Sequence, residues 1–209
     1  MKIFMTGATG FIGRHVLAAA RQAGHEVIGF SRRPLSREGF AEMWPWQPVA
    51  EADFSGLDAV VHLAGENLLG LWTRRKREAI RRSRVEDTRA LVSRLRALPH
   101  PPRLLVSAGG CAYYGDGGDA ELPESAPAGR GFIAEVAREW EGAAMEAADI
   151  MRVVTLRTGM VLGADGGAAP VLRRIFKWGL GGRLGGGQHW MPWIEVLDLA
   201  RLILFAVEC

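Results

Sequence analysis

Short apolar runs alternate along the chain with longer stretches whose apolar residues recur at helical spacing. The short runs predict buried strands at Lys2–Thr6, Glu26–Phe30, Ala59–Ala64, Arg103–Ser107 and Arg152–Arg157. The longer stretches predict helices at Phe11–Ala23, Thr73–Leu98 and Phe132–Ala148. Strands that alternate with helices in this way predict an α/β fold, in which a doubly wound parallel sheet carries helices on both faces.

Two segments are less regular. Residues 33–56 contain few periodic positions, and we expect at most a short strand at Trp44–Trp46. Glycine-rich stretches follow the last predicted strand and enclose a short predicted helix at Val171–Trp178. The final residues have apolar side chains at helical spacing and stop at Cys209 without a capping signal, so we expect the architecture to be incomplete there.

Composition excludes several classes of function. The chain has 209 residues, of which 48% are hydrophobic and 23% charged, as expected for one compact domain or one domain and part of another. Its net charge of +3 is too small to suggest nucleic-acid binding. No run approaches the roughly 20 apolar residues of a membrane span, and the N-terminus lacks the pattern of a signal peptide. We therefore expect no nucleic-acid or membrane partner.

The two cysteines indicate neither a metal site nor a disulfide. Cys111 and Cys209 do not have the spacing of metal ligands, and the histidines are scattered. This cysteine usage fits the reducing cytoplasm. Cys111 has no histidine paired with it in a motif, so we expect a small buried thiol rather than a nucleophile.

Three glycines separate the first predicted strand from the first predicted helix. The segment "MTGATGFIGRHV" places Gly7, Gly10 and Gly13 in a G-x-x-G-x-x-G pattern. Glycines at such a turn let the backbone approach a pyrophosphate, whose charge is stabilised by free N–H groups at the helix N-terminus. The context predicts a Rossmann-type dinucleotide site. The residues expected to contact the cofactor here are Gly7, Thr9, Gly10, Phe11, Ile12 and Gly13.

The end of the second strand favours NADP(H) over NAD(H). NAD enzymes usually carry an acidic residue at this point, which accepts hydrogen bonds from the ribose 2′-hydroxyl. Here the positions are Ser31 and Arg32, a hydroxyl and a guanidinium that can bind a 2′-phosphate. The alternative is that Arg32 is a solvated loop charge.

Several further motifs occur together with the glycine turn and in a fixed order. They are "DAVVHLAGEN", "SRVEDT", "SAGGCAYYGD", "LRTGMVLG", "WIEVLDLA", the helix pattern W-T…K…I…SR and the glycine-rich loop before "WI". With them the chain resembles an extended short-chain dehydrogenase/reductase, and more narrowly the atypical epimerase-family branch of sugar-nucleotide epimerase-like proteins. The resemblance covers essentially all of the chain.

The resemblance implies further contacts and a second domain. The strand end "HLAGE" would lie beside the ribose and nicotinamide of the cofactor, which implies contacts from Leu63, Ala64, Gly65 and Glu66. Arg84 stands where ordinary members have an asparagine, so a role near the cofactor is implied. The resemblance also divides the chain into an NADP(H)-binding domain, 1–162, and the start of a small C-terminal substrate domain, 163–209. A homodimer is implied at the level of the family only.

The acid/base residues of the family are missing. Ordinary members use a tyrosine and, four residues later, a lysine on one helix face. Here those positions are Phe132 and Val136, which can neither exchange a proton nor supply a charge. The third position, a Ser or Thr, falls at Gly109. Ser107, two residues earlier, has either a structural role at a strand end or, if the alignment shifts, a place beside the cofactor.

Other titratable residues are candidates for the lost chemistry. The catalytic candidates are Tyr114, Tyr113 and Glu66, with Lys76 and Glu135 also expected near the cleft. For the two tyrosines the alternative is loop packing with one hydroxyl hydrogen bond. The loop "GLGGRLGGGQHWMPW" either binds a substrate phosphate through its backbone or forms a series of tight turns.

Two functions remain open from the sequence. The first is an NADP(H)-dependent epimerase or reductase that acts on a small molecule, with proton transfer delegated to an unusual side chain or to water. The second is a non-catalytic NADP(H)-binding regulatory or interaction protein, because related proteins are described as cell-division inhibitors.

Overall fold

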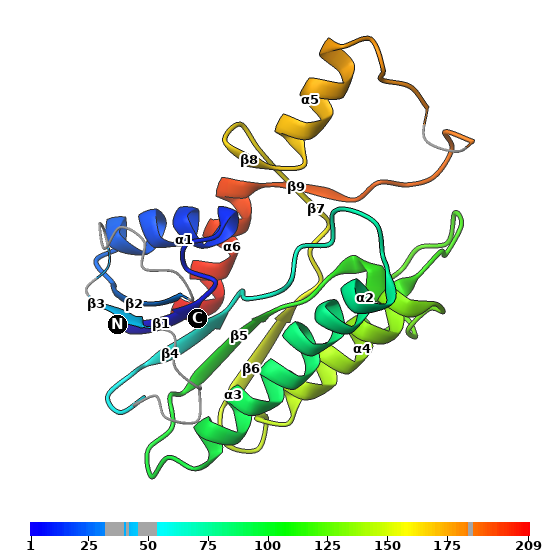
Figure 1. Ribbon diagram of the computed structural model, residues 1–209. Helices are drawn as coiled ribbons and strands as arrows, with labels where there is room; N and C mark the ends of the chain where they lie inside the picture. The colour runs from blue at the N-terminus through cyan, green and yellow to red at the C-terminus, as the bar shows by residue number, and fades with distance from the viewer. Residues whose placement is uncertain (32–39, 41, 46–53, 184–185) are drawn as a thin grey trace.

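A parallel sheet with helices on both faces forms the body of the molecule (Figure 1). The computed structural model describes residues 1–31, 40, 42–45, 54–183 and 186–209. Within these residues the main sheet has six strands in the order β3-β2-β1-β4-β5-β6, every neighbouring pair parallel. The strands are β1 (Lys2–Thr6), β2 (Glu26–Ser31), β3 (Glu42–Pro45), β4 (Ala59–His62), β5 (Leu104–Ala108) and β6 (Arg152–Leu156). The predicted Rossmann-type doubly wound fold is confirmed.

Alternating residues of β1, β2, β4, β5 and β6 enter two separate cores. Ile3 and Met5 of β1 belong to the core under α1 (Phe11–Gln22) and α6 (Val196–Glu208). Phe4, between them, belongs to the core under α3 (Asp87–Arg96) and α4 (Phe132–Met145). Side chains of a strand point to opposite faces, so continuous apolar strands such as β1 supply both layers.

The predicted helix Thr73–Leu98 is not a single regular helix. It consists of α2 (Arg74–Arg81), the π-helical turn η2 (Arg82–Glu86) and α3. A π turn contains an additional residue and shifts the helix face. Here it turns Arg84 into the interior, where only 9% of the residue is exposed.

A second, small sheet was not predicted. It has the order β8-β7-β9 and consists of β7 (Met160–Gly163), β8 (Gly166–Gly167) and β9 (Trp193–Glu195). Its strands are only two to four residues long, and β7 pairs with β9 some thirty residues later, so periodicity could not reveal them. The short helix η3 (Cys111–Tyr114) was not predicted either. The short helix predicted at Val171–Trp178 is present as α5 (Ala169–Lys177). The short strand expected at Trp44–Trp46 is β3 as far as Pro45, and Trp46 lies outside the described residues.

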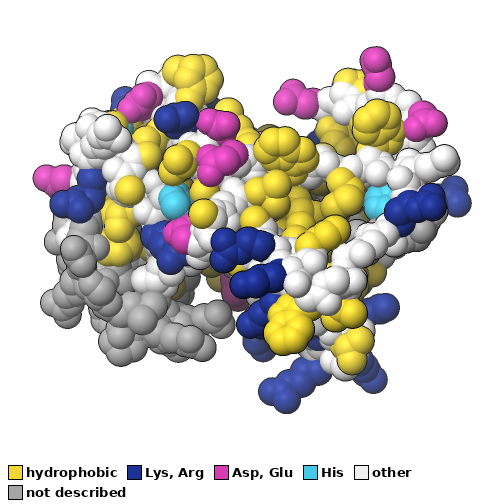
Figure 2. Space-filling view, turned by 90° about the horizontal axis from the view of Figure 1, so that it is seen from above, with side chains coloured by type: hydrophobic (Ala, Val, Ile, Leu, Met, Phe, Trp, Pro, Cys, Tyr) yellow, Lys and Arg dark blue, Asp and Glu magenta, His cyan; other side chains and the backbone are white. Residues whose placement is uncertain are grey.

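The C-terminal part of the chain separates into two regions. Helix α6 packs against α1, and its residues Leu199 and Ile203 join the core of the main sheet. Helix α5 lies away from that body (Figure 1), and it contains no buried residue. Figure 2 views the molecule from this side and shows hydrophobic side chains across the middle of the face. The division at residue 162 stays a prediction, although α6, beyond it, contributes to the main core.

Candidate functional site

The glycine turn after β1 is closely packed against the end of β4. Gly7 has φ +68°, a conformation that favours glycine, and a Cβ there would lie 2.9 Å from the backbone nitrogen of Ala64. A Cβ at Gly13 would lie 2.4 Å from the carbonyl oxygen of Gly7. Both positions therefore exclude side chains, and the turn holds the start of α1 directly over the carboxyl ends of β1 and β4.

The first turn of α1 leaves its backbone donors without a side-chain cap. Gly10 is the N-cap, makes no side-chain capping hydrogen bond, and no acidic residue occupies the first turn. By contrast, Thr73 caps α2 and Glu195 caps α6. Uncapped N–H groups at a helix N-terminus suit an anion such as a pyrophosphate. The residues at this turn therefore fit the diphosphate of a dinucleotide.

Phe11 fixes the start of α1 to the small sheet. A Cβ at Gly163, Gly166 or Gly167 would come within 2.7 Å of the Phe11 ring. His15 and Arg14 both pair with Asp165 in the same hairpin, at 3.2 and 3.1 Å. These bonds lower the pKa of the Asp165 carboxyl. The expected cofactor residue Phe11 therefore uses its ring for packing, which leaves its backbone for any contact with a ligand.

The end of β2 is only partly described. Ser31 is the last residue of β2 and pairs with Pro45 of β3, which places it at the carboxyl edge of the sheet. Arg32 lies outside the described residues. The expected 2′-phosphate contacts of Ser31 and Arg32 stay predictions.

A buried chain of hydrogen bonds crosses the end of β4. His62 is 2% exposed, its Nδ1 lies 2.7 Å from the Thr6 hydroxyl, and its Nε2 lies 3.0 Å from the Thr88 hydroxyl. The Thr88 hydroxyl donates to the carbonyl of Arg84, so its oxygen accepts a hydrogen bond from Nε2–H of His62. In a neutral imidazole Nδ1 then has no proton, and it accepts a hydrogen bond from the Thr6 hydroxyl. The Thr6 oxygen in turn accepts from the Ala64 N–H. The imidazole is neutral, because burial lowers the pKa of His62 from 6.5 to about 4.

Glu66, four residues after His62, is fixed by three contacts. Its N–H donates to the Ser83 hydroxyl at 2.9 Å, and its carbonyl accepts from Arg84 Nη1 at 3.0 Å. Its carboxylate pairs with Lys76, whose Nζ lies 2.6 Å from Oε1. Glu66 is therefore held at the carboxyl edge of the sheet, and its contact with a cofactor stays a prediction.

Arg84, for which the resemblance implies a role near the cofactor, lies against the backbone of Gly65 and Glu66. A Cβ at Gly65 would lie 3.4 Å from the Arg84 guanidinium carbon, and the guanidinium also stands 5.1 Å over the Trp140 ring. Burial lowers the pKa of Arg84, and the nearby Glu66 charge partly opposes that shift. In this position Arg84 supports the backbone of Gly65 and Glu66, while the cofactor contacts expected of Leu63, Ala64 and Gly65 stay predictions.

The two tyrosines meet an arginine that sequence reasoning missed. Arg157 follows β6 and donates to both carboxylate oxygens of Glu141, at 2.8 and 2.9 Å. It also donates to the Tyr114 hydroxyl at 2.7 Å, and its guanidinium carbon stands 3.6 Å from the centroid of the Tyr113 ring. Hydrogen bonding to Glu141 raises the pKa of Arg157.

This arginine cluster links η3, α4 and β6. Within it the Tyr114 hydroxyl oxygen accepts a hydrogen bond from Arg157, and Tyr114 remains a candidate proton donor. A signal for Arg157 was available in the sequence, since a charged residue at the carboxyl end of a parallel strand often serves a site.

No exposed hydroxyl stands at the position of the family's Ser or Thr, because Gly109 lacks a side chain and the nearby Ser107 is buried. Ser107 is 1% exposed, and its hydroxyl donates to the Ala108 carbonyl at 3.2 Å. A Cβ at Gly109 would lie 3.0 Å from the Leu156 carbonyl oxygen. The contacts favour the structural role for Ser107, and its contact with a cofactor stays a prediction.

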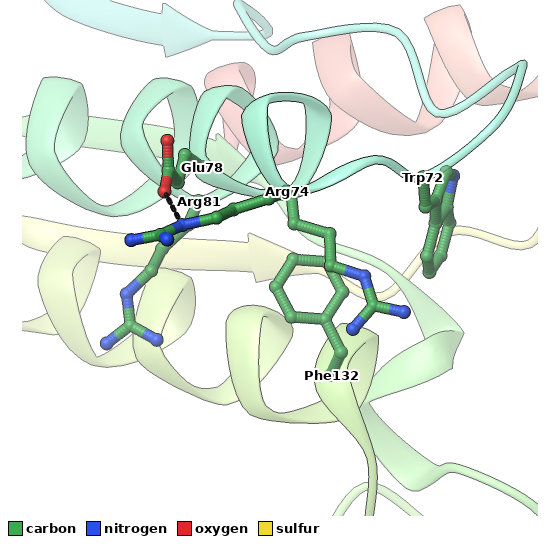
Figure 3. Close-up of a pocket in the computed structure, with 6 residues that line it drawn as sticks. Trp72, Arg74, Glu78, Arg81 and Phe132 are labelled. Carbon is green, nitrogen blue, oxygen red and sulfur yellow. Dashed lines mark hydrogen bonds and ion pairs between the residues drawn. The ribbon is translucent and has the colours of Figure 1, made fainter.

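The start of α4 contains aromatic packing in place of acid/base groups. Phe132 makes an edge-to-face contact with Trp72, with ring centroids 5.7 Å apart, and the Arg77 guanidinium lies over its ring. Both aromatics line a shallow pocket of about 340 Å³ together with Arg74, Arg77, Glu78 and Arg81 (Figure 3). Two of its arginines form ion pairs: Arg74 pairs with Glu78 within the lining, and Arg81 pairs with Glu139. Arg77, the third arginine of the lining, lies over the Phe132 ring, and none of the lining residues belongs to the glycine turn.

Among the described residues, no group of three or more His, Cys, Asp or Glu is arranged to hold a metal ion. Where the chain is described, no helix combines the length and the apolar character that crossing a membrane requires. Cys111 is half-buried, and burial raises the pKa of its thiol.

Comparisons with known proteins agree with this geometry. The model of the NAD-dependent epimerase/dehydratase family matches residues 3–209. A chloroplastic SDR39U1 homolog, an epimerase family protein of Arabidopsis thaliana, is 37% identical over 99% of this chain and 62% of its own length. The chain thus spans less than two thirds of that relative.

Two solved structures share the fold and more than a quarter of the sequence. Human epimerase family protein SDR39U1, crystallised with NADPH, superposes with a TM-score of 0.91 at 35% identity and covers all of this chain and 70% of its own. A nucleoside-diphosphate sugar epimerase from Corynebacterium glutamicum has a TM-score of 0.83 at 33% identity, over 99% of this chain and 43% of its own.

Proposed function

Because this chain belongs to the NAD-dependent epimerase/dehydratase family, we propose that it binds NADP(H) at the turn after β1 and acts on a small molecule as an epimerase or reductase. The observation that carries the proposal is the turn itself. Gly7 and Gly13 leave no room for a side chain, and α1 presents uncapped N–H groups above them. When bound, the cofactor would supply or take up a hydride.

The choice of NADP(H) is supported from two sides. The human relative was crystallised with NADPH, and the present chain has Ser31–Arg32 where NAD enzymes carry an acidic residue. Contacts of Leu63, Ala64, Gly65 and Glu66 with the nucleotide are part of the proposal, since Gly7 touches the Leu63–Ala64 backbone.

Titration calorimetry of wild type and Arg32→Ala with NADPH and with NADH tests the cofactor choice. We expect wild type to prefer NADPH and the substitution to weaken NADPH binding at least tenfold, because a charge-assisted hydrogen bond to a phosphate is lost. NADH binding should change little. An equal loss for both nucleotides would contradict the assignment of Arg32.

Proton transfer falls to Tyr114 or Glu66 in this proposal. Tyr114 accepts from Arg157, and Glu66 is paired with Lys76, so both are fixed in place at the carboxyl edge of the sheet. NADPH absorbance can be followed against a panel of carbonyl compounds and nucleotide sugars, with Tyr114→Phe and Glu66→Gln alongside. Turnover that one of these substitutions abolishes identifies the acid/base residue.

A non-catalytic NADP(H)-binding protein is the second candidate. The packing of Phe132 against Trp72 and the complete burial of Val136 favour it, because α4 has lost the family's chemistry and filled the space with apolar contacts. NADPH binding without turnover on the whole panel would support this alternative. A cytoplasmic location and a homodimer remain proposals from the sequence, and size-exclusion chromatography with light scattering tests the second.

A further inference from the structure

Helix α4 brings no ammonium group to the edge of the proposed nucleotide site. Val136, where the family carries a lysine, is 0% exposed. Phe132, one turn earlier, contacts Trp72 and Arg77. If the site uses a cation from this side, another element has to supply it.

Helix α2 brings a lysine to that edge. Lys76 lies in the first turn of α2, where its N–H donates to the capping Thr73 hydroxyl at 3.3 Å. Trp72, just before the cap, and Arg77 of α2 both touch Phe132. The start of α2 therefore lies against the start of α4, and from there the Lys76 side chain reaches Glu66, with 2.6 Å between Nζ and Oε1.

The backbone of Glu66 belongs to the segment that touches the glycine turn. Ala64, two residues earlier, lies 2.9 Å from the Cβ position of Gly7 and donates its N–H to Thr6. Ser83 and Arg84 of η2 hold the N–H and the carbonyl of Glu66 itself. A short, fixed stretch of backbone thus connects the Glu66–Lys76 pair to the turn.

The Glu66–Lys76 pair can still form hydrogen bonds with a ligand. The side chains of Lys76 and Glu66 are 21% and 32% exposed, so solvent reaches the pair from one side. An ammonium has three donors, and the structure engages one of them with Glu66. The remaining donors suit hydroxyl or phosphate oxygens of a nucleotide lying over the turn.

We propose that Lys76, oriented by Glu66, is a ligand-binding residue of this site and donates hydrogen bonds to the bound dinucleotide, supplying the cation that α4 lacks. The inference rests on the proposed binding of NADP(H). It adds α2 to the elements that form the site.

The test compares NADPH affinities of Lys76→Met and Arg75→Met by titration calorimetry. Met keeps most of the lysine stem and removes the ammonium. We expect Lys76→Met to bind NADPH at least tenfold more weakly than wild type, and Lys76→Arg to recover part of the loss. Arg75 is exposed on the same helix, so Arg75→Met removes an equal charge and should bind like wild type.

The double variant Lys76→Met/Glu66→Gln separates ligand binding from a structural role. It removes both charges of the pair and leaves no unpaired carboxylate. We expect its thermal midpoint to match that of wild type while its NADPH affinity stays low. Affinity restored to the wild-type value in the double variant, or unchanged in Lys76→Met, would overturn the inference. A wild-type chain that fails to bind NADPH would instead overturn the proposed function itself, and the role of Lys76 with it.

Discussion

At the scale of single residues, His62 shows how a polar group is accommodated in an apolar strand. It is the last residue of β4, directly after Val60 and Val61, and Thr6 and Thr88 satisfy both of its ring nitrogens. A buried polar group without such partners would destabilise the fold. The sequence could have identified it, since a histidine within "AVVHLA" is the one titratable residue of that run. Its partners could not be predicted, because Thr88 lies on a helix whose π turn sets the register.

The first prediction concerns stability against pH. The folded-state pKa of His62, about 4, lies below its ordinary 6.5. The native state therefore binds fewer protons than the unfolded state between these values, and stability falls as the pH falls from 6.5 towards 4. At about 1.4 kcal/mol per pKa unit, the loss is on the order of 3 kcal/mol.

Urea denaturation of wild type and His62→Gln at pH 7, 5.5 and 4.5 measures this effect. Gln can still form hydrogen bonds but does not titrate, so its free energy of unfolding should fall less over this range. Lowered carboxyl pKa values such as that of Asp165 act in both proteins and cancel in the comparison. Identical slopes in the two proteins would contradict the buried neutral imidazole.

At the scale of elements, the sequence predicted helix α4 and the loss of the family's tyrosine and lysine from it. It did not predict which contacts α4 makes. The apolar stripe predicted the helix start at Phe132, which the structure confirms. The bidentate pair of Glu141 with Arg157 was not predicted, because the two residues come from different elements. Periodicity specifies which face of a helix is buried, whereas ion pairs depend on how that face meets β6.

The second prediction asks whether the family's residues can be restored to α4. Val136→Lys would bury an ammonium in a fully enclosed position, so we expect a loss of about 3 kcal/mol or more in the free energy of unfolding. Phe132→Tyr should change it by less than about 1 kcal/mol, since the ring is partly exposed beside the pocket of Figure 3. Chemical denaturation of the two single variants gives the comparison. An equal free energy of unfolding for Val136→Lys and Phe132→Tyr would contradict the complete burial of the Val136 side chain.

At the scale of the whole molecule, the sheet brings the site together. Strand order reverses between β1 and β4, and ligands of such sheets bind at the carboxyl ends of the strands that flank this point. The motifs predicted the glycine turn and the β4 end separately. They could not predict that a Cβ at Gly7 would meet Ala64, nor that α2 would bring Lys76 to Glu66. These contacts come from packing between segments distant in sequence.

The glycine positions provide a matched pair of variants for the central claim. Gly13→Ala places a methyl group 2.4 Å from the Gly7 carbonyl oxygen and should distort the turn, with a loss of about 1–3 kcal/mol. Gly142→Ala meets open space in α4 and should stabilise the helix by about 0.5–1 kcal/mol. Thermal denaturation separates these effects on stability from effects on binding.

NADPH titration of wild type, Gly13→Ala and Gly142→Ala, at a temperature where all three are folded, is the most direct test that the turn after β1 holds the nucleotide. The account predicts saturable one-site binding by wild type and Gly142→Ala, and a loss of at least tenfold in affinity for Gly13→Ala. No binding by wild type, or equal binding by all three proteins, would contradict it.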